Sequence, residues 1–518
     1  MDTQSLLFRA RQCQSDGRLD EAMFFFNKIL RKDPKQTQAI IGAAEIAKCL
    51  GKHQTAYQLL CQVIKLAPNH AEAFEHRGNL LQILGRSKDA INDFSIAMNL
   101  NRQTASIFNS RGIAFAHLGN FDQAIADFSE AIDRQSNLAD TFYNRALAHR
   151  KKGNYASAID DYTTTINLKP DHFQAYNNRG FAHRELRQYS DAIIDFEKCV
   201  EINPSFHDAY WNASLCLLAL GNFQKGWALY EYRWSSTSFT SPRRNFSAPL
   251  WLGKERLAGK TILIHSEQGL GDTLQFCRYV PMIEALDCKV ILEVEQPLIG
   301  IMRSISRKIK LIHKNSELPK FDYHCPLMSL PLAFSTTLKT IPNHLPYLEV
   351  DSSRVAYWKG KLGVKNKPRI GLVWRGNPAH QKDSERSIPL RDILPWLSPD
   401  FDWISLQKDI FDDEKKMIEA SKKIINYGDE ISDFADSGAL CKSLDAILCV
   451  DTSIAHLAGA LCVTTHLLLP YISDFRWHTD GVASRWYKTL RLYRQGRDRT
   501  WDESLKNAQT AIKRGFLA

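Results

Sequence analysis

The 518-residue sequence lacks the long apolar segments that mark membrane proteins. No run of about 18 uninterrupted apolar residues occurs, so we expect no membrane-spanning helix. The first residues show no basic stretch followed by an apolar one, so we expect no secretory signal. The 11 cysteines are scattered and form no Cys-x-x-Cys pair, which favours reduced thiols over disulfides or structural zinc. Together these absences predict a cytoplasmic protein.

The sequence also lacks the short motifs of several enzyme classes. It contains no His-Glu-x-x-His, no phosphate-loop lysine motif and no Gly-x-Ser-x-Gly. We therefore expect no metal site and no tightly bound cofactor. The net charge is +10, and most of this excess follows residue 236. Such an excess suits an anionic ligand, such as a nucleotide, but it is too diffuse to predict nucleic-acid binding.

The first half of the sequence repeats with a period of 34 residues. In each unit a glycine is followed five residues later by an alanine and then by a bulky ring or a leucine. Glycine permits the left-handed turn at the end of a helix, and small alanines let two helices approach closely. The glycines are Gly17, Gly51, Gly85, Gly119, Gly153 and Gly221, with Arg187 at the remaining position. The pattern resembles the tetratricopeptide repeat and predicts about seven helix–turn–helix units over residues 1–236.

Stacked units of this kind form a superhelix with a concave groove, lined by the first helix of each unit. Two ladders of side chains at the repeat spacing are expected in that groove. They are Asn144, Asn178 and Asn212, and Arg77, Arg111, Arg145 and Arg179. Asparagine side chains can hold the backbone of an extended peptide, so we expect a protein or peptide partner. The ladders are also compatible with ordinary helix-surface residues, or with arginines that pack between units.

The periodicity changes after Trp234. A polar, proline-bearing stretch predicts a linker over residues 237–258, and short β-branched runs then alternate with helical ones. This alternation predicts parallel sheets in two Rossmann-like halves, residues 259–358 and 359–518. Two such domains facing one cleft resemble the GT-B architecture of glycosyltransferases, and this resemblance implies that the first half is the acceptor side and the second the nucleotide-sugar side. The predicted fold is therefore an α-solenoid followed by an α/β GT-B module.

The first candidate site is the loop SEQGLG at 266–271, which follows a predicted strand and opens a helix. Gly269 and Gly271 allow a ligand to approach the backbone, and amides at a helix start can hold an anion. Asp272 would stand at that helix start, beside the cleft. Helix capping is the alternative role for this aspartate, and the two roles are compatible. A dinucleotide fingerprint is disfavoured because Leu274 occupies the place of the third glycine.

The second candidate site is the segment CVDTSIAHLAGAL at 449–461. Asp451 ends a predicted strand, and a helix begins directly after it, with the hydroxyls of Thr452 and Ser453 at its start. His456 follows one turn later. This arrangement can hold a phosphate or diphosphate at the carboxyl end of a parallel strand. An ordinary capping turn, with His456 packed in the interior, explains the same residues.

A third candidate is the loop 374–387, which follows the first strand of the second α/β half. Its polar side chains either neutralise a departing nucleotide diphosphate or form a solvated loop. They are Arg375, Asn377, Lys382 and Arg386. Gln407 and Lys408 end the next strand and should point into the same cleft. A basic run at 485–497 fits acidic acceptors or peripheral contact with a membrane, and it also fits a plain surface strand and turn.

Four segments together resemble bacterial tetratricopeptide-repeat proteins that end in a heptosyltransferase-like glycosyltransferase domain. They are SEQGLGDTLQFCRYVP, FDYHCPLMSLPLAF, RIGLVWRGN and VDTSIAHLAGAL. The resemblance implies that Asp272 is the general base and that Lys382 or Arg386 contacts phosphate. The residues that it implies for the donor ribose and diphosphate are Asp451, Thr452, Ser453 and His456. Ser453 replaces a glycine that is usual in that family.

The domain order also resembles the O-linked N-acetylglucosamine transferases, which implies that the repeat groove presents a polypeptide to the active site. The predicted function is therefore transfer of a sugar from a nucleotide-diphosphate sugar to an acceptor hydroxyl, with inversion and without a metal ion. The nucleotide sugar is a co-substrate rather than a cofactor. The alternative is a repeat scaffold whose GT-B domain is catalytically silent and serves protein–protein interaction.

Overall fold

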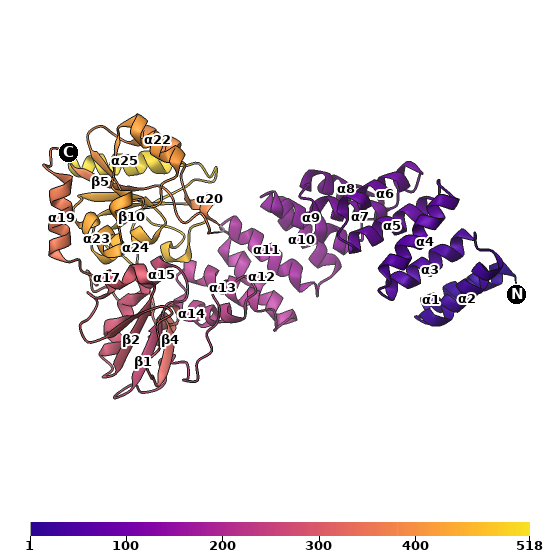
Figure 1. The fold of residues 1–518 in the computed structure, drawn as a ribbon, viewed down its shortest axis with the longest axis horizontal. Coiled ribbons are helices and arrows are strands. Elements are labelled where there is room, and N and C mark those ends of the chain that lie inside the picture. Colours follow the sequence, from indigo (N-terminus) through magenta and orange to yellow (C-terminus); the bar gives the residue numbers. More distant parts are fainter. Residues whose placement is uncertain (1, 381, 518) are drawn as a thin grey trace. The chain divides into compact units, whose positions relative to one another are not determined.

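The computed structural model describes residues 2–380 and 382–517, and the chain divides into two compact units. The first unit is Met1–Asn203 and the second is Pro204–Ala518. The first consists of paired helices, drawn from indigo to magenta in Figure 1, and the second contains every strand of the described chain. No helix within the described residues combines the length and the apolar character that crossing a bilayer requires.

Within the described residues, the first unit consists of six helical hairpins, each built from helices of 13 or 14 residues. They are α1 (Thr3–Ser15) with α2 (Leu19–Lys32), α3 (Thr37–Cys49) with α4 (His53–Leu66), α5 (Ala71–Ile83) with α6 (Ser87–Asn99), α7 (Ala105–His117) with α8 (Phe121–Arg134), α9 (Ala139–Lys151) with α10 (Tyr155–Leu168), and α11 (Phe173–Glu185) with α12 (Tyr189–Ile202). Each hairpin packs on the next, as in a solenoid. The predicted helix–turn–helix repeat is confirmed.

The turn inside each hairpin requires a left-handed backbone. Gly17 has a φ of 76°, and the other glycines of the 34-residue lattice have similar values. Arg187, where the lattice has no glycine, adopts a φ of 61° in the same turn. Between the helices, a Cβ on Gly78 would lie 2.7 Å from the ring of Phe94. Glycine therefore sets both the turn and the close approach of the paired helices.

A seventh hairpin continues the repeat but belongs to the second unit. It consists of α13 (His207–Ala219) and α14 (Phe223–Tyr230), and the 3-10 helix η1 (Glu231–Ser235) follows. The Trp227 ring packs edge-on against Phe276 and Phe475, with centroids 5.9 and 5.7 Å away. These aromatic contacts bury α14 against the α/β part. The second unit therefore starts at Pro204, ahead of the expected boundary at 236.

The described part of the second unit contains two sheets whose strand pairs are all parallel, as predicted. The first has the order β3-β2-β1-β4, and the second has the order β10-β9-β8-β5-β6-β7. The first sheet comprises β1 (Thr261–His265), β2 (Lys289–Val294), β3 (Lys310–His313) and β4 (Tyr323–Pro326). The second comprises β5 (Arg369–Val373), β6 (Asp402–Ser405), β7 (Ile424–Asn426), β8 (Ala446–Val450), β9 (Thr465–Leu469) and β10 (Leu490–Arg494).

Helices connect the strands, and the last helix follows β10. They are α15 (Leu270–Phe276), α16 (Val280–Glu284), α17 (Ile299–Met302), α18 (Leu330–Ala333), α19 (Ser352–Leu362), α20 (Asp383–Arg386), α21 (Leu390–Ile393), α22 (Asp412–Ser421), α23 (Phe434–Lys442), α24 (Ser453–Ala460) and α25 (Asp502–Phe516). The 3-10 helices are η2 (Cys277–Tyr279), η3 (Gln296–Leu298), η4 (Leu327–Ser329), η5 (Leu394–Trp396), η6 (Gly428–Glu430) and η7 (Phe475–Trp477). The helix that was expected to open after the glycine loop is divided into α15, η2 and α16.

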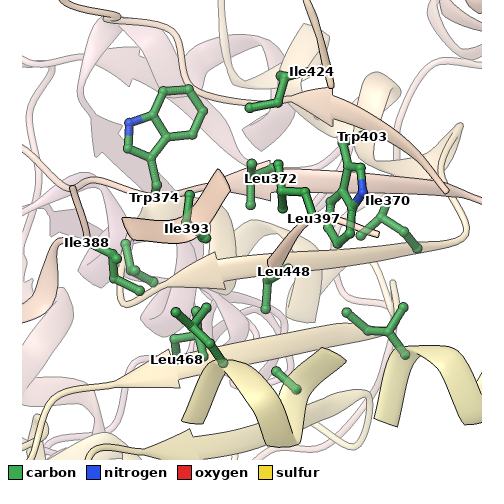
Figure 2. Close-up of a cluster of buried hydrophobic side chains, with 14 of the residues drawn as sticks. Ile370, Leu372, Trp374, Ile388, Ile393, Leu397, Trp403, Ile424, Leu448 and Leu468 are labelled. Atoms are coloured by element: carbon green, nitrogen blue, oxygen red, sulfur yellow. The ribbon is translucent and has the colours of Figure 1, made fainter. Parts of the chain in front are cut away.

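The core of the second sheet lies between its strands and the helices that cover it. All five residues of β5 are buried, because a parallel sheet is covered on both faces. Figure 2 shows the cluster around Leu372, Trp374 and Trp403. Leu505 and Ile512 of the C-terminal helix α25 close this cluster from one side. The packing fixes the carboxyl ends of β5 and β8, from which the candidate loops emerge.

In each sheet, the strands that follow the first strand along the chain are added on one side of it and then on its other side, so the strand order reverses there. Counted from β5, the second sheet has the order 6-5-4-1-2-3, which is the order of dinucleotide-binding doubly wound sheets. Ligands of such sheets bind outside the carboxyl ends of the strands where the order reverses. The reversal lies between β1 and β4 in the first sheet and between β5 and β8 in the second. The three candidate segments follow β1, β5 and β8.

The stretch predicted as a linker, residues 237–258, is folded against the first sheet. Leu250 forms a parallel bridge with His324 of β4. The Trp251 side chain is buried, and its indole N–H donates to the Glu255 carbonyl at 2.9 Å. The Phe246 ring packs on His324 with centroids 4.7 Å apart. The segment is therefore part of the second unit rather than a free connection.

Candidate functional site

Asp272 lies in the first turn of α15, after the glycine loop that follows β1. The helix begins at Leu270 with Gly269 as its N-cap, so Asp272 is the third helical residue rather than the cap itself. Its Oδ2 accepts a hydrogen bond from the Gly269 amide at 2.8 Å. This contact satisfies a backbone donor at the helix start. The capping role that the sequence offered as an alternative for Asp272 is therefore present.

Arg476 provides the second contact of the Asp272 carboxylate. It lies in η7, which follows β9, and its Nη2 forms an ion pair with Oδ1 of Asp272. Its Nη1 lies 2.8 Å from Oδ1 of Asp474. The Arg476 side chain is 8% exposed, and its Nε has no partner among the described residues. One buried guanidinium thus joins the first sheet's helix to a loop of the second sheet.

The acids of this region have perturbed pKa values. Burial raises the pKa of Asp272 above its usual range, and the charge of Arg476 opposes that rise. Burial also raises the pKa of Asp451 to about 6, helped by Asp474 and opposed by Arg386 and Arg476. These acids and cations therefore share one electrostatic environment. Such perturbed groups concentrate at functional sites.

The start of α24, which follows β8, carries a hydroxyl that forms no hydrogen bond within the described residues. Thr452 is the N-cap residue, yet its side chain makes no capping hydrogen bond. Its Oγ1 is buried and has no partner among the residues that the structure describes. A buried polar group without a partner costs roughly 1–3 kcal/mol. The Thr452 hydroxyl is therefore available to an atom of a ligand at the end of β8.

Gly271 brings the first and second candidate segments together. A Cβ at this position would lie 2.9 Å from Cδ2 of His456 and 3.4 Å from Cα of Ser453. His456 is buried, its Nδ1 lies 3.0 Å from the Tyr487 hydroxyl, and its ring stacks on Trp477. The interior position that the sequence offered for His456 is therefore observed. The absence of a side chain at Gly271 lets α15 and α24 meet.

Arg386 is the cation of the third segment that joins this group. It ends α20, and its Nη1 donates to the Asp451 carbonyl at 3.1 Å. Its Nε lies 3.2 Å from Oδ1 of Asp383, and its side chain is 21% exposed. Lys382 is exposed, and its backbone amide donates to Nδ1 of His380 at 3.2 Å. Of the two phosphate-binding candidates, Arg386 is thus the one in contact with Asp451.

Arg375 lies in a different environment from the one expected. Its side chain is 9% exposed, and its Nη2 lies 3.2 Å from the Glu414 carboxylate and 2.6 Å from the Asp409 carbonyl. The guanidinium also lies 3.7 Å from the centroid of the Phe411 ring. Its charge is therefore paired within the fold. Its Nε is buried and has no partner among the residues that the structure describes.

The other polar residues that were expected near the nucleotide form hydrogen bonds with the backbone of the loops. Gln407 is buried, and its Oε1 accepts from the Arg375 amide at 3.3 Å. Lys408 is exposed, and its Nζ donates to the Ser432 carbonyl at 3.3 Å. Asn377 is exposed and accepts from the Ala379 amide at 3.0 Å. Gln407 and Lys408 thus lie just after the end of β6, and Asn377 lies in the loop after β5, each with a contact to the backbone.

A buried ion pair between Arg233 and Glu267 anchors the glycine loop. Nε and Nη2 of Arg233, in η1, each lie 3.0 Å from a carboxylate oxygen of Glu267. The two side chains are 0% and 3% exposed. The Met328 amide donates to Oε1 of Glu267 at 2.9 Å. The end of the seventh hairpin thereby fixes the loop that carries Gly269 and Gly271.

Sequence reasoning did not find Arg476, Asp474 or Tyr487. Arg476 pairs with a residue 204 positions earlier, and no spacing in the sequence reveals such a pair. One signal was available, because the segment SDFRWHTD follows the last apolar strand, β9. Charged residues at the carboxyl end of a strand beside β8 belong to the ligand-binding edge of a parallel sheet.

The arginine ladder of the repeats has a packing role. Arg111 makes two hydrogen bonds of 2.7 Å to the Asp127 carboxylate on the second helix of its hairpin. Its Nη1 lies 3.1 Å from the Ser95 hydroxyl of the preceding hairpin. The equivalent pairs are Arg77–Asp93, Arg145–Asp161 and Arg179–Asp195. The arginines thus pack between units, as the alternative to partner binding predicted.

The asparagine ladder is divided between the two units. Asn144 Nδ2 lies 3.4 Å from Oδ1 of Asn109, and Asn178 Nδ2 donates to the Tyr143 hydroxyl at 2.9 Å. These contacts link successive first helices of the solenoid. Asn212 lies on α13, in the second unit. Peptide binding by the ladder stays a prediction.

Comparison with known proteins decides the nature of the repeats. A tetratricopeptide repeat model matches residues 139–172 and 173–206, and a second such model matches residues 77–139. The repeats are tetratricopeptide repeats. The chain is also 25% identical over 321 residues to Protein FlbA of Caulobacter vibrioides, over 57% of this chain and 53% of the relative. The chain therefore spans about half the length of that curated relative.

Solved structures with similar helical repeats include three examples. The MamA protein is 24% identical, over 33% of this chain and 92% of its own, with a TM-score of 0.31. The C-terminal part of a repeat protein from Cytophaga hutchinsonii is 18% identical over 45% and 96%, with a TM-score of 0.39. A tetratricopeptide repeat protein from Parabacteroides merdae is 18% identical over 44% and 91%, with a TM-score of 0.35.

Proposed function

We propose that the second unit is a cytoplasmic glycosyltransferase of the GT-B type, which moves a sugar from a nucleotide-diphosphate sugar to an acceptor hydroxyl. The observation that carries this proposal is the contact of α15 with α24 at Gly271 and His456. This contact lies at the carboxyl ends of strands beside which both sheets reverse their order. Asp272, Arg476, Arg386 and the free hydroxyl of Thr452 gather around it.

In the proposed reaction, Asp272 takes the proton of the acceptor hydroxyl as its oxygen attacks the anomeric carbon. The bond between that carbon and the diphosphate oxygen breaks on the opposite face, so the configuration inverts. General-base assistance of this kind contributes about 10²–10⁴ in rate. Burial makes Asp272 a stronger base once it has ionised, because it raises the pKa of the carboxyl.

The leaving nucleoside diphosphate needs positive charge and hydrogen-bond donors. Arg386, Arg476 and the amides at the start of α24 supply them in this proposal. Removing one such stabiliser costs about 3 kcal/mol of barrier. These groups carry the charge of the reaction without a metal ion. The nucleotide sugar is consumed as a co-substrate. The positive charge that stabilises its diphosphate comes from basic side chains of this protein.

Tetratricopeptide repeats serve protein interaction, and we propose that their partner supplies the acceptor hydroxyl. Asn144 and Asn178 lie at equivalent positions of α9 and α11, one repeat apart. Their amides can hydrogen-bond the backbone of an extended peptide. We leave the arginine ladder out of this proposal, because its charges are paired with buried aspartates.

A repeat scaffold with a silent GT-B domain is the second candidate, and the contacts of Asp272 favour it. Both carboxylate oxygens already have partners, one in the Gly269 amide and one in Arg476. A carboxylate committed to a cap and an ion pair is a weaker base than a free one. In this alternative the same contacts only join the two sheets.

The two candidates are separated by an assay of nucleoside diphosphate release from UDP-, GDP-, ADP- and CDP-sugars. Wild-type chain is compared with Asp272→Asn, which keeps an oxygen for the Gly269 amide but cannot take a proton. Asp351→Asn is the matched control, because Asp351 also accepts a backbone amide at a helix start, at 2.7 Å from Ser353. Release that only Asp272→Asn loses supports the enzyme, and equal rates in all three exclude Asp272 as the base. No release by wild type supports the scaffold.

A further inference from the structure

His456 and Tyr487 form a hydrogen-bonded pair where α24 meets the glycine loop. Nδ1 of His456 lies 3.0 Å from the Tyr487 hydroxyl, and the imidazole is 6% exposed. Trp477 stacks on the imidazole with centroids 5.3 Å apart and planes 20° apart. The other edge of the ring faces Gly271, where a Cβ would lie 2.9 Å from Cδ2 and 3.6 Å from Nε2. The orientation of the imidazole is thus fixed on three sides.

The hydrogen-bond donors around Tyr487 determine to which acceptor its hydroxyl donates. The Tyr347 hydroxyl donates to the Leu274 carbonyl at 2.8 Å, so the Tyr347 oxygen can only accept further bonds. Nη2 of Arg278 already donates to that oxygen at 3.1 Å. The Tyr487 hydroxyl lies 3.4 Å from Tyr347 but only 3.0 Å from His456. The shorter contact therefore leads to the imidazole.

Arg278 polarises this hydroxyl. Its guanidinium lies 4.6 Å from the centroid of the Tyr487 ring and is 3% exposed. It donates to the carbonyls of Gln275 at 2.8 Å and Trp486 at 3.0 Å, and within the described chain no carboxylate pairs with it. A cation beside a phenol favours donation by its hydroxyl, and an imidazole nitrogen is a better acceptor than a second phenol. The Tyr487 proton is thus directed to Nδ1 of His456.

We propose that Tyr487 is a positioning residue that holds His456 as the neutral tautomer with its proton on Nε2, the ring edge facing Gly271. In a neutral imidazole one nitrogen accepts and the other donates, so acceptance at Nδ1 makes Nε2 the donor. That donor is offered to a phosphate oxygen of a nucleoside diphosphate bound beside Gly271. Only the identity of this ligand rests on the proposed function, and the tautomer does not.

The surroundings keep the imidazole uncharged. Burial lowers the pKa of His456 well below its usual range, and the positive charges of Arg476 and Arg278 lower it further. His456 therefore offers one N–H at neutral pH while the imidazole itself stays uncharged. A fixed donor of this kind needs no reorientation when the ligand arrives.

The test is long-range proton–nitrogen NMR of the full chain labelled with nitrogen-15 histidine, which distinguishes the two neutral tautomers. The His456 signal is identified by its loss in His456→Gln. We expect the wild type to show Nε2–H alone and Tyr487→Phe to show a mixture with Nδ1–H. Tyr493→Phe is the matched control, because it removes a similar bond from Tyr493 to Nδ1 of His466, at 2.8 Å. It should leave the His456 signal unchanged.

The wild-type spectrum tests the tautomer even if a variant does not fold. Nδ1–H at His456 in the wild type overturns the proposal, and so does an unchanged tautomer in folded Tyr487→Phe. Addition of ADP, GDP, UDP or CDP then tests the ligand contact. A nucleotide that stabilises the chain but leaves the Nε2 resonance unmoved overturns that contact. If none stabilises the chain, the nucleotide-sugar function and the ligand contact both fail, while the tautomer result stands by itself.

Discussion

The carboxylate of Asp272 and the guanidinium of Arg476 form an ion pair between α15, which follows β1, and η7, which follows β9. The same guanidinium contacts Asp474, so a single cation serves two acids. The pair connects the first sheet to the second at the point where the candidate ligand groups gather. It therefore contributes both to the packing of the two sheets and to the protonation of the proposed base.

The first prediction concerns the protonation of Asp272. Asp272 acts as a base only when ionised, and Arg476 favours the ionised form. Arg476→Gln removes that charge, so the pKa of Asp272 rises and the acidic limb of the rate profile moves to higher pH, by about 1 unit. Arg476→Lys keeps the charge and should shift the limb less. The rate of nucleoside diphosphate release, measured as a function of pH, gives the position of the acidic limb. If that position is the same in Arg476→Gln and in the wild type, the assignment of Asp272 as the base is contradicted.

The second prediction concerns the space at Gly271. In Gly271→Ala the new Cβ meets the His456 ring and the backbone of Ser453, so α15 and α24 must move apart. Such overpacking costs about 1–3 kcal/mol. Gly360→Ala is the control, because the Cβ of a residue at this position of α19 meets nothing within 4 Å. An alanine there should be neutral or stabilising by about 0.4–1 kcal/mol.

Urea unfolding followed by tryptophan fluorescence measures both glycine variants. All 11 tryptophans lie at or after Trp211, so their fluorescence reports the second unit alone. Gly271→Ala should also abolish nucleotide binding, whereas Gly360→Ala should retain it. Equal unfolding midpoints for the two variants contradict the close contact of α15 with α24.

The third prediction follows from the pKa of Asp451. Its folded-state value is about 6, above the ordinary 3.8, so folding favours the protonated acid. The stabilisation is present below pH 4 and is lost as the pH rises through 6. Asp451→Asn stays neutral at every pH, so its advantage over wild type should grow from nearly zero at pH 4 to at most about 3 kcal/mol at pH 7.5. Midpoints of unfolding at several pH values test this, and a difference independent of pH contradicts it.

The fourth prediction concerns the buried pair behind the glycine loop. Arg233→Met leaves the Glu267 carboxylate buried without its cation, which should destabilise the second unit by about 3–5 kcal/mol. The double variant Arg233→Met with Glu267→Gln removes the unpaired charge and should recover most of that loss. The tryptophan signal in urea measures both. A double variant no more stable than Arg233→Met shows that Glu267 is not the destabilised group.

The solenoid was predictable because its signals are local. Glycine at a fixed spacing marks a left-handed turn, and the structure has positive φ values at those glycines and at Arg187. The strand predicted before the second candidate site is observed as β8, which ends at Val450, since a short apolar run between a helix and an aspartate has few other interpretations. By contrast, residues 237–258 were predicted to be a linker from their polar composition, but Leu250 and Phe246 pack this stretch against His324 of the first sheet.

The candidate site was predictable only in part. Gly271, Asp272, Asp451 and His456 follow strands in the sequence, and parallel strands bring their carboxyl ends to one edge. The partners that neutralise or orient these groups come from distant segments, and their pairing depends on packing. Arg375 was placed by its position after β5, whereas its contact with Glu414, 39 positions later, could not be read from the sequence.

The most direct test of the central claim is thermal unfolding of the second unit, followed by tryptophan fluorescence, with ADP, GDP, UDP, CDP and their sugars. A ligand at a hundred times its dissociation constant adds about 2.7 kcal/mol of stability. We predict that one nucleotide and its sugar raise the midpoint in wild type and fail to do so in Gly271→Ala. If none of them raises the midpoint of the wild-type chain, the second unit does not hold a nucleotide sugar and the account is wrong.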